Sequence, residues 1–183
     1  MGFSPAHLFL VVLAVERGIE LIVSRLNEIH IRKLGGKEYA AAFTSLLTGF
    51  HVCWFFSFGI EAAAREAKLL FSPVTLTAVF LVFQTLRYWC IFCLGRFWNV
   101  KIITLPGAEL IRTGPYRLLK HPNYIVVALE IFVYPLFFGC WTTALVFGPA
   151  NLWVLKRRIR QEETALLTSS APGPGTIPSG LSA

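Results

Sequence analysis

The sequence predicts an all-α integral membrane protein of about five transmembrane helices, the last two of which form a tight hairpin. Three observations predict this class. Hydrophobic residues make up 55% of the 183 residues and charged residues 15%, and the mean hydropathy is +0.62, too apolar for a soluble domain. Apolar runs long enough to span a bilayer recur along the chain, and basic residues collect in short clusters beside them. This composition excludes disordered, collagen-like and disulfide-scaffold classes.

Three apolar runs, at about 5–23, 40–60 and 73–94, are each long enough at about 1.5 Å per residue to cross a hydrocarbon core of about 30 Å. The apolar stretch 124–155 holds 32 residues, which is too long for one ordinary span. Residues that punctuate helices interrupt it, namely Pro135, Gly139, Gly148 and Pro149. We therefore expect a hairpin that breaks near 138–141, with arms at about 124–138 and 141–155. Because the arms are short, a partly re-entrant pair is the alternative.

The distribution of basic residues predicts the orientation. The loop after the first run carries Arg25, Arg32, Lys33 and Lys37, and the loop after the second carries only Arg65 and Lys68. Further basic clusters follow the third run and the last arm, so five crossings place every rich cluster in the cytoplasm. We expect the N-terminus outside, the C-terminus in the cytoplasm and, in a bacterium, location in the inner membrane. These clusters indicate topology despite the net charge of +7, and we expect no nucleic-acid partner.

The domain is expected to cover residues 1–167, and the Ser, Pro, Gly and Ala-rich segment 168–183 to form a disordered tail. The first run should be retained and not cleaved, because no basic segment precedes it and charged residues interrupt its second half.

Polar residues in the first run share one helical face. Those within a stripe of about 120° are Glu16, Arg17, Glu20, Ser24, Asn27 and Glu28. This stripe must face protein or water, since ionisable groups are costly against lipid. It predicts either an internal salt bridge of Arg17 with Glu20 or Glu16, or one wall of a ligand cavity.

Two further ionisable residues lie within apolar runs. Arg87 needs a carboxylate partner, for which Glu130 or the glutamates of the first run are the choices; alternatively it holds an anionic substrate group. Glu130 would suit base chemistry if it were unpaired, because burial raises a carboxyl pKa, and would be structural if it paired with Arg87. The Cys90-x-x-Cys93 pair lies in an apolar helix and is interpreted as packing, and the four histidines show no metal-ligand spacing, so no metal site is expected.

Turn, aromatic and charged residues crowd between residues 94 and 130. The ordered motifs are Gly114-Pro115-Tyr116-Arg117, then Lys120-His121-Pro122-Asn123-Tyr124, and later Arg158-Ile159-Arg160-Gln161-Glu162-Glu163. Pro122 suits the start of a helix, which places His121 at its rim. Arg158 and Glu162 are four apart and predict a surface ion pair, which leaves His121 and Glu163 unexplained.

This ordered set around an apolar hairpin resembles the isoprenylcysteine carboxyl methyltransferases and related membrane phospholipid methyltransferases, over about residues 94–166. Lys120 departs from the arginine found in many relatives, which keeps the charge and loses the planar fork. The glutamate-rich pattern 16–28 and Leu105-Pro106-Gly107-Ala108 are similar to a bacterial branch found beside type III polyketide synthases, whose members resemble alkylpyrone methyltransferases.

The resemblance implies that S-adenosylmethionine binds on the cytoplasmic side, between the last helices and the preceding loop. The cofactor-binding residues that it implies are Gly114, Tyr116, Arg117, His121, Tyr124, Glu162 and Glu163. The chemistry of methyl transfer makes Arg87, Glu130 and His121 the candidate catalytic residues: Arg87 would orient an anionic acceptor, whereas Glu130 or His121 would serve as base for a neutral hydroxyl.

The implied acceptor is a lipophilic molecule from the bilayer, either an isoprenylcysteine carboxylate, an alkylpyrone-type polyketide hydroxyl or a lipid amine. The expected partners are membrane lipid and a partner from a type III polyketide synthase pathway. The alternatives are a nicotinamide-dependent membrane reductase of similar architecture, a thiol oxidoreductase that uses Cys90 and Cys93, and a membrane scaffold without enzymatic activity.

Overall fold

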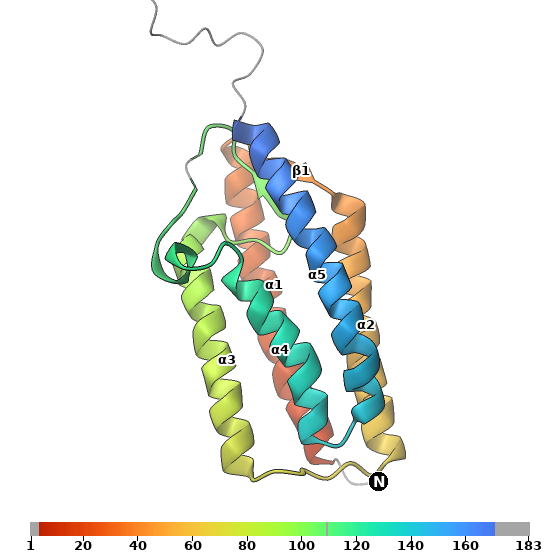
Figure 1. Cartoon of the computed structure of the whole chain (residues 1–183). Coiled ribbons are helices and arrows are strands. Elements are labelled where there is room, and N and C mark those ends of the chain that lie inside the picture. Colours follow the sequence, from red (N-terminus) through yellow and green to blue (C-terminus); the bar gives the residue numbers. More distant parts are fainter. Residues whose placement is uncertain (1–3, 109, 171–183) are drawn as a thin grey trace, which may run out of the picture.

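The computed structural model describes residues 4–108 and 110–170, and within them five long helices run alternately up and down (Figure 1). They are α1 (Pro5–Lys33), α2 (Ala41–Ala64), α3 (Pro73–Leu94), α4 (Pro122–Phe137) and α5 (Trp141–Ser170). The 3-10 helices η1 (Gly95–Phe97) and η2 (Gly114–Arg117) and the strands β1 (Lys37–Tyr39) and β2 (Ile102–Thr104) complete the described fold. These short elements gather at one end of the bundle, which we call the rim end (Figure 1).

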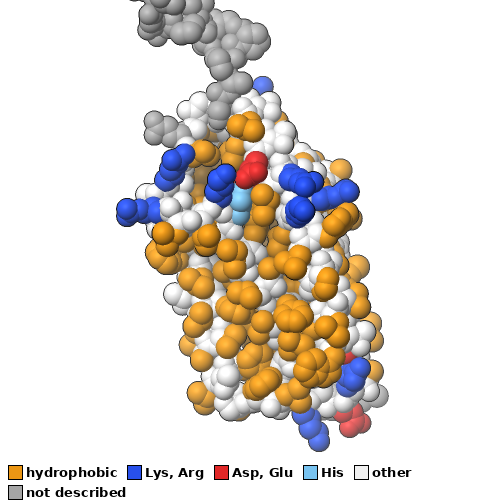
Figure 2. Space-filling model, in the orientation of Figure 1, with side chains coloured by type: hydrophobic (Ala, Val, Ile, Leu, Met, Phe, Trp, Pro, Cys, Tyr) orange, Lys and Arg blue, Asp and Glu red, His pale blue; other side chains and the backbone are white. Residues whose placement is uncertain are grey.

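Two of the described helices are long and apolar enough to cross a membrane by length and composition, over Ala41–Ala64 and Pro73–Phe97. The helix α4 is apolar but shorter. Hydrophobic side chains cover much of the bundle surface on the face shown in Figure 2, whereas most Lys and Arg side chains gather around the rim end and a few lie at the opposite end. The predicted helical character and the apolar second and third runs are confirmed, and five crossings stay a prediction.

Three boundaries differ from the sequence-based expectation. The helix α1 continues ten residues past 23, to Lys33, because its polar stripe finds partners at the rim end. The helix α5 runs through 168–170, which we had assigned to the disordered tail; residues 171–183 lie outside the described part. The antiparallel pair of β1 and β2, in which Lys37 pairs with Thr104, corrects the all-α prediction. A three-residue strand is too short to show alternating polarity, so β-branched Ile102, Ile103 and Thr104 gave no clear signal.

The hairpin of α4 and α5 breaks where it was predicted. The helix α4 ends at Phe137 and α5 begins at Trp141. Gly139 takes a φ of +69°, which favours glycine, and the backbone N–H of Cys140 donates to the Pro135 carbonyl at 2.9 Å. An aromatic core packs inside this half of the bundle, with Phe9 edge-on to Tyr134 at 5.0 Å between ring centroids. These contacts leave the interior nearer the rim end free for a cavity.

Candidate functional site

A cavity of about 990 Å³ extends from the rim end into the helical bundle. Residues of all five helices and of segment 97–121 line it. Its outer part is polar, with His121, Glu162 and Glu163, and its inner part includes the apolar side chains of Trp54 and Ile131. Concave, largely apolar sites with a few convergent polar groups are typical of ligand pockets. One cavity therefore offers a polar mouth and an interior that is largely apolar, apart from one wall of charged side chains.

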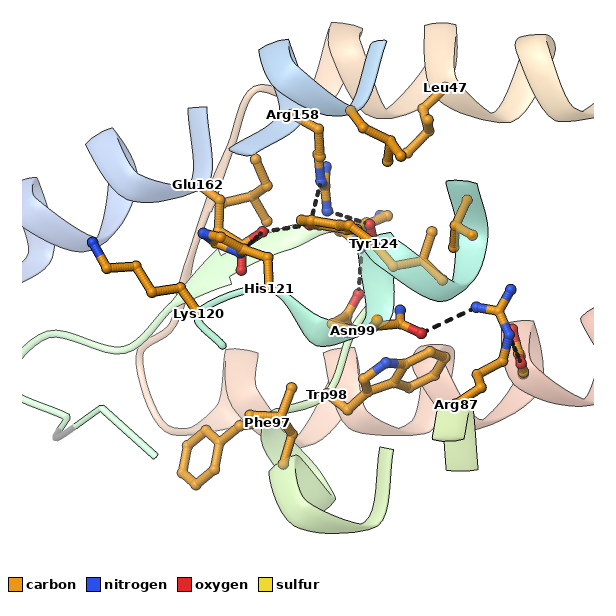
Figure 3. A pocket seen from close by; sticks show the side chains of 18 of the residues that line it. Leu47, Arg87, Phe97, Trp98, Asn99, Lys120, His121, Tyr124, Arg158 and Glu162 are labelled. Atoms are coloured by element: carbon orange, nitrogen blue, oxygen red, sulfur yellow. Dashed lines mark hydrogen bonds and ion pairs between the residues drawn. The ribbon is translucent and has the colours of Figure 1, made fainter. Parts of the chain in front are cut away.

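Tyr124 is at the centre of the outer part of the cavity (Figure 3). Its hydroxyl donates to the Glu162 carboxylate and accepts from Arg158 Nε at 3.2 Å. Arg158 is only 3% exposed, and it also donates to the Val100 carbonyl at 2.5 Å and to Thr44 Oγ1 at 3.3 Å. The expected surface ion pair of Arg158 with Glu162 is therefore wrong. Both side chains meet at the tyrosine hydroxyl, because α2 and the loop after η1 cover the arginine.

His121 lies beside this group, at the N-terminal end of α4. Its ring stacks on the Tyr124 ring, with centroids 5.5 Å apart and an interplanar angle of 15°. Its Nε2 atom is 3.5 Å from a Glu163 oxygen, and its Nδ1 atom is 4.0 Å from a Glu162 oxygen. Nε2 is buried and makes no hydrogen bond within the described residues. Lys120 lies at the mouth, 3.9 Å from Glu163. The structure thus brings four of the predicted cofactor residues together at one place, namely His121, Tyr124, Glu162 and Glu163.

The helix η2 places the other three predicted cofactor residues in two different environments. Tyr116 and Arg117 line the cavity. Burial raises the pKa of the Tyr116 hydroxyl, so this group stays protonated beside the Cys90 thiol. Gly114 packs against α3 instead: a Cβ there would lie 2.4 Å from Cys93 Sγ and 2.9 Å from Trp89 Nε1. Its φ of +52° also favours glycine, so Gly114 fixes the position of η2 from outside the cavity.

A buried ionic cluster forms the inner wall. Arg17 pairs with Glu20 at 2.8 Å and with Glu130 at 3.2 Å. Arg87 pairs with Glu130 at 2.6 Å and with Glu20 at 3.3 Å. Glu16, 3.3 Å from Arg17, completes the cluster, and four of its members line the cavity. The predicted internal salt bridge of the first run is confirmed, and the same side chains also form a cavity wall.

Glu130 is paired on both carboxylate oxygens. Its Oε1 atom accepts from Arg17 and from Gln84 Nε2 at 3.3 Å, and its Oε2 atom accepts from Arg87. The sequence-based argument gave Glu130 a base role only if it were unpaired. The observed pairing favours the structural role, in which Glu130 fixes both arginines.

The remaining residues of the α1 stripe attach the loop after α3. Ser24 donates to Asn99 Oδ1 at 3.0 Å, and Asn27 donates to the Trp98 carbonyl at 2.8 Å. Glu28 accepts hydrogen bonds from Lys101 at 2.9 Å and from two α1 arginines, Arg25 at 2.7 Å and Arg32 at 2.9 Å. Desolvation opposes ionisation of Glu28, but the hydrogen bonds from these three cations outweigh it and lower its pKa to about 2. These bonds hold one wall of the cavity, including Trp98 and Asn99, against α1.

Several cavity residues were absent from the predicted site, among them Trp98, Asn99, Asn123 and Arg158. Asn123 and Arg158 stand inside motifs that the sequence analysis quoted, and Trp98 and Asn99 lie within the crowded stretch 94–130. The sequence therefore identified the region and not every member. Among the described residues, no group of His, Cys, Asp or Glu side chains is arranged to hold a metal ion.

The fold and the site define a membrane-associated helical protein with a cavity that joins a polar mouth to a largely apolar interior. The family model described as isoprenylcysteine carboxyl methyltransferase (ICMT) family matches residues 75–168, and the chain belongs to this family. It is 36% identical to the uncharacterized protein YpbQ of Bacillus subtilis over 87% of this chain and 95% of that protein. It is 30% identical to an uncharacterized protein of Haemophilus influenzae, over 86% and 92% of the two chains. No solved structure matches the chain, and the comparisons give the reductase alternative no support.

Proposed function

We propose that this protein is a membrane-embedded, S-adenosylmethionine-dependent O-methyltransferase that acts on a lipophilic acceptor. The acceptor would be an isoprenylcysteine carboxylate or an alkylpyrone-type polyketide hydroxyl, the latter with a type III polyketide synthase as pathway partner. The observation that carries this proposal is the convergence of His121, Tyr124, Glu162 and Glu163 at the mouth of a cavity with an apolar interior, in a member of a methyltransferase family.

The side chains at the mouth fit the cofactor chemically. The carboxylates of Glu162 and Glu163 suit a cationic sulfonium, an ammonium or ribose hydroxyls. His121 Nε2 is a buried polar atom without a hydrogen bond in the described part, which is costly unless a ligand satisfies it. When bound, S-adenosylmethionine would supply an activated methyl group on a good neutral leaving group.

The protein residues would act mainly by positioning. Arg158 would hold the Tyr124 hydroxyl, which in turn fixes the Glu162 carboxylate, and Tyr116 and Arg117 also line the cavity. His121 is the candidate base if the acceptor is a neutral hydroxyl. Arg87 and Glu130 would shape the acceptor end of the cavity through their ion pair, and they would not take part in proton transfer.

The topology belongs to the same proposal. The five helices would each cross the bilayer, with the mouth of the cavity and the C-terminus in the cytoplasm and the N-terminus outside. The basic rim end supports this orientation, because Lys and Arg collect on the cytoplasmic side of membrane proteins. A water-soluble cofactor would then enter at the mouth and a lipophilic acceptor from the bilayer.

Equilibrium binding of S-adenosylmethionine to the detergent-purified protein tests the proposal. We expect Glu163→Gln and His121→Ala each to weaken binding by about 10-fold or more, the usual effect of losing a charge-assisted contact. Glu66→Gln is the matched control, because Glu66 is exposed in the loop after α2, far from the rim end, and should not change the affinity. Folded protein that binds no cofactor, in detergent and again in lipid bilayers, would exclude the proposed function.

A further inference from the structure

The helix α5 runs the length of the bundle (Figure 1), and its outward face changes from apolar to basic within one helical turn. At about 100° per residue, its exposed side chains between 145 and 160 fall within a stripe of about 140°. The first part of this stripe is apolar, since Leu145, Leu152 and Trp153 are 63%, 60% and 54% exposed. The part nearer the rim end carries three exposed cations, which we call the α5 cation cluster: Lys156, Arg157 and Arg160.

The α5 cation cluster has no counter-ion in the described part of the chain. Arg158, from the same basic run, turns inward to the Tyr124 hydroxyl, so the run divides between the cavity and the outer surface. The next acidic residue toward the rim end on the outward side is Glu163, and it lies against Lys120 and His121 instead. None of the three cluster side chains forms an ion pair with another described residue. Three neighbouring positive charges without a partner attract an anion.

Trp153 fixes the position of the central cation. The guanidinium carbon of Arg157 lies 4.3 Å from the centroid of the Trp153 ring, one helical turn away. Such stacking uses the flat face of the guanidinium and leaves its in-plane N–H donors free. These donors make no hydrogen bond to any other described residue. Tryptophan is also favoured at the depth where hydrocarbon meets the lipid headgroups. The stack therefore holds a free pair of donors at the edge of the apolar surface.

We infer that the α5 cation cluster binds the phosphate of an anionic glycerophospholipid in the leaflet at the rim end. Arg157 donates two N–H bonds to the phosphate oxygens, and Lys156 and Arg160 add charge on either side. The apolar side chains between 145 and 153 continue the site, and the acyl chains lie along them. A zwitterionic lipid fits less well, because its own ammonium already neutralises its phosphate. This inference goes beyond the proposed function and shares with it only the embedding of α5 in a bilayer.

Quenching of tryptophan fluorescence by brominated lipids tests this site, because bromine quenches only a tryptophan close to the acyl chain that carries it. The full chain is reconstituted in phosphatidylcholine bilayers that contain either phosphatidylglycerol or phosphatidylcholine brominated near the glycerol. We expect phosphatidylglycerol to be preferred by about 10-fold or more, since each cation at the surface favours an anionic lipid several-fold. Trp153→Phe should remove the excess quenching, which identifies the reporter among the five tryptophans.

Variants of the cluster separate a built site from general surface charge. A chain with Lys156→Gln, Arg157→Gln and Arg160→Gln together should lose the preference for phosphatidylglycerol. Arg157→Lys keeps the charge but loses the planar fork, so the preference should fall several-fold without disappearing. The matched control removes the same number of charges from exposed cations on other elements that form no ion pair with a described residue, through Lys33→Gln, Lys68→Gln and Arg96→Gln. This control should keep the preference of the unaltered chain.

The inference is overturned if the two brominated lipids quench equally, or if the cluster variant and the control lose the preference alike. It is also overturned if soluble glycerol 3-phosphate displaces the lipid, because the site would then take free phosphates. Absence of quenching of Trp153 by either lipid would place α5 outside the bilayer and contradict the proposed topology as well. Binding of S-adenosylmethionine is measured separately, so failure of the lipid site leaves the proposed activity standing.

Discussion

Glu61, near the end of α2, caps the first turn of α5 by accepting the backbone N–H of Thr143 at 2.7 Å. The same carboxylate accepts the Thr142 N–H at 3.0 Å and the Thr143 hydroxyl at 2.8 Å. The first N–H groups of a helix have no partner inside it, so an acceptor from another helix satisfies them. Here one side chain both caps α5 and ties it to α2.

We expect Glu61→Ala to lower the free energy of unfolding by about 1–2 kcal/mol, the usual cost of a lost cap. Glu61→Gln should cost less, because its amide oxygen still accepts one N–H. Unfolding of the purified protein by sodium dodecyl sulfate in mixed micelles, followed by circular dichroism, measures both. A fully stable Glu61→Ala variant would contradict the cap.

Loss of Glu130 should destabilise the protein more than it affects the cofactor. Glu130→Ala leaves Arg17 and Arg87 short of a partner, and breaking a buried ion pair costs about 3–5 kcal/mol. The affinity for S-adenosylmethionine should change little. The control Glu38→Gln breaks the more exposed ion pair with Arg32 and should cost less than about 1 kcal/mol. A Glu130→Gln variant that keeps full stability, binds both ligands and transfers no methyl group would instead support a base.

Two glycines with positive φ give a matched test of how η2 is held. Gly114→Ala would drive a methyl group into Cys93 and Trp89, so we expect a loss of about 1–3 kcal/mol and weaker cofactor binding as η2 shifts. Gly107 has a φ of +76°, but a Cβ added there would have no atom within 4 Å. Gly107→Ala should therefore cost only backbone strain of about 1 kcal/mol and keep the cofactor affinity. Unfolding and binding titrations on both variants compare them directly. Equal losses of cofactor affinity in the two would exclude the packing explanation.

Glu28 should make stability depend on pH in the acid range. It lies in the last turns of α1, past the expected first span, and its pKa falls from 4.5 to about 2 in the folded protein. A lowered folded-state pKa stabilises the fold above pH 4.5, and this contribution is lost as the pH falls from 4.5 to about 2. The stability difference between the unaltered chain and Glu28→Gln should therefore shrink over this interval in unfolding titrations. A constant difference would show that the ion pairs of Glu28 contribute nothing.

The polar stripe of α1 could be predicted because helical periodicity alone determines which residues share a face. Glu16, Glu20, Ser24 and Glu28 are all buried as expected. Their partners could not be predicted, since the contact of Ser24 with Asn99 joins residues 75 apart in the sequence. Helical periodicity determines which residues share a face, whereas only the tertiary fold determines which residues contact that face.

The error at Arg158 has the same origin. Its spacing from Glu162 is that of a surface pair, and nothing nearby in the sequence indicates that Thr44 and Val100 cover it. The strands β1 and β2 were missed because each holds only three residues and is stabilised by the other. The hairpin was predicted correctly because glycine and proline mark its break within the sequence itself.

A single cavity that opens to water at its mouth and is largely apolar inside has a consequence for enzyme kinetics. Under the proposed function, the two ligands would arrive from different phases. The rate would depend on the bulk concentration of the cofactor but on the mole fraction of the acceptor within the membrane. Adding inert lipid at constant acceptor would slow the reaction, as surface dilution does, and leave the response to cofactor unchanged.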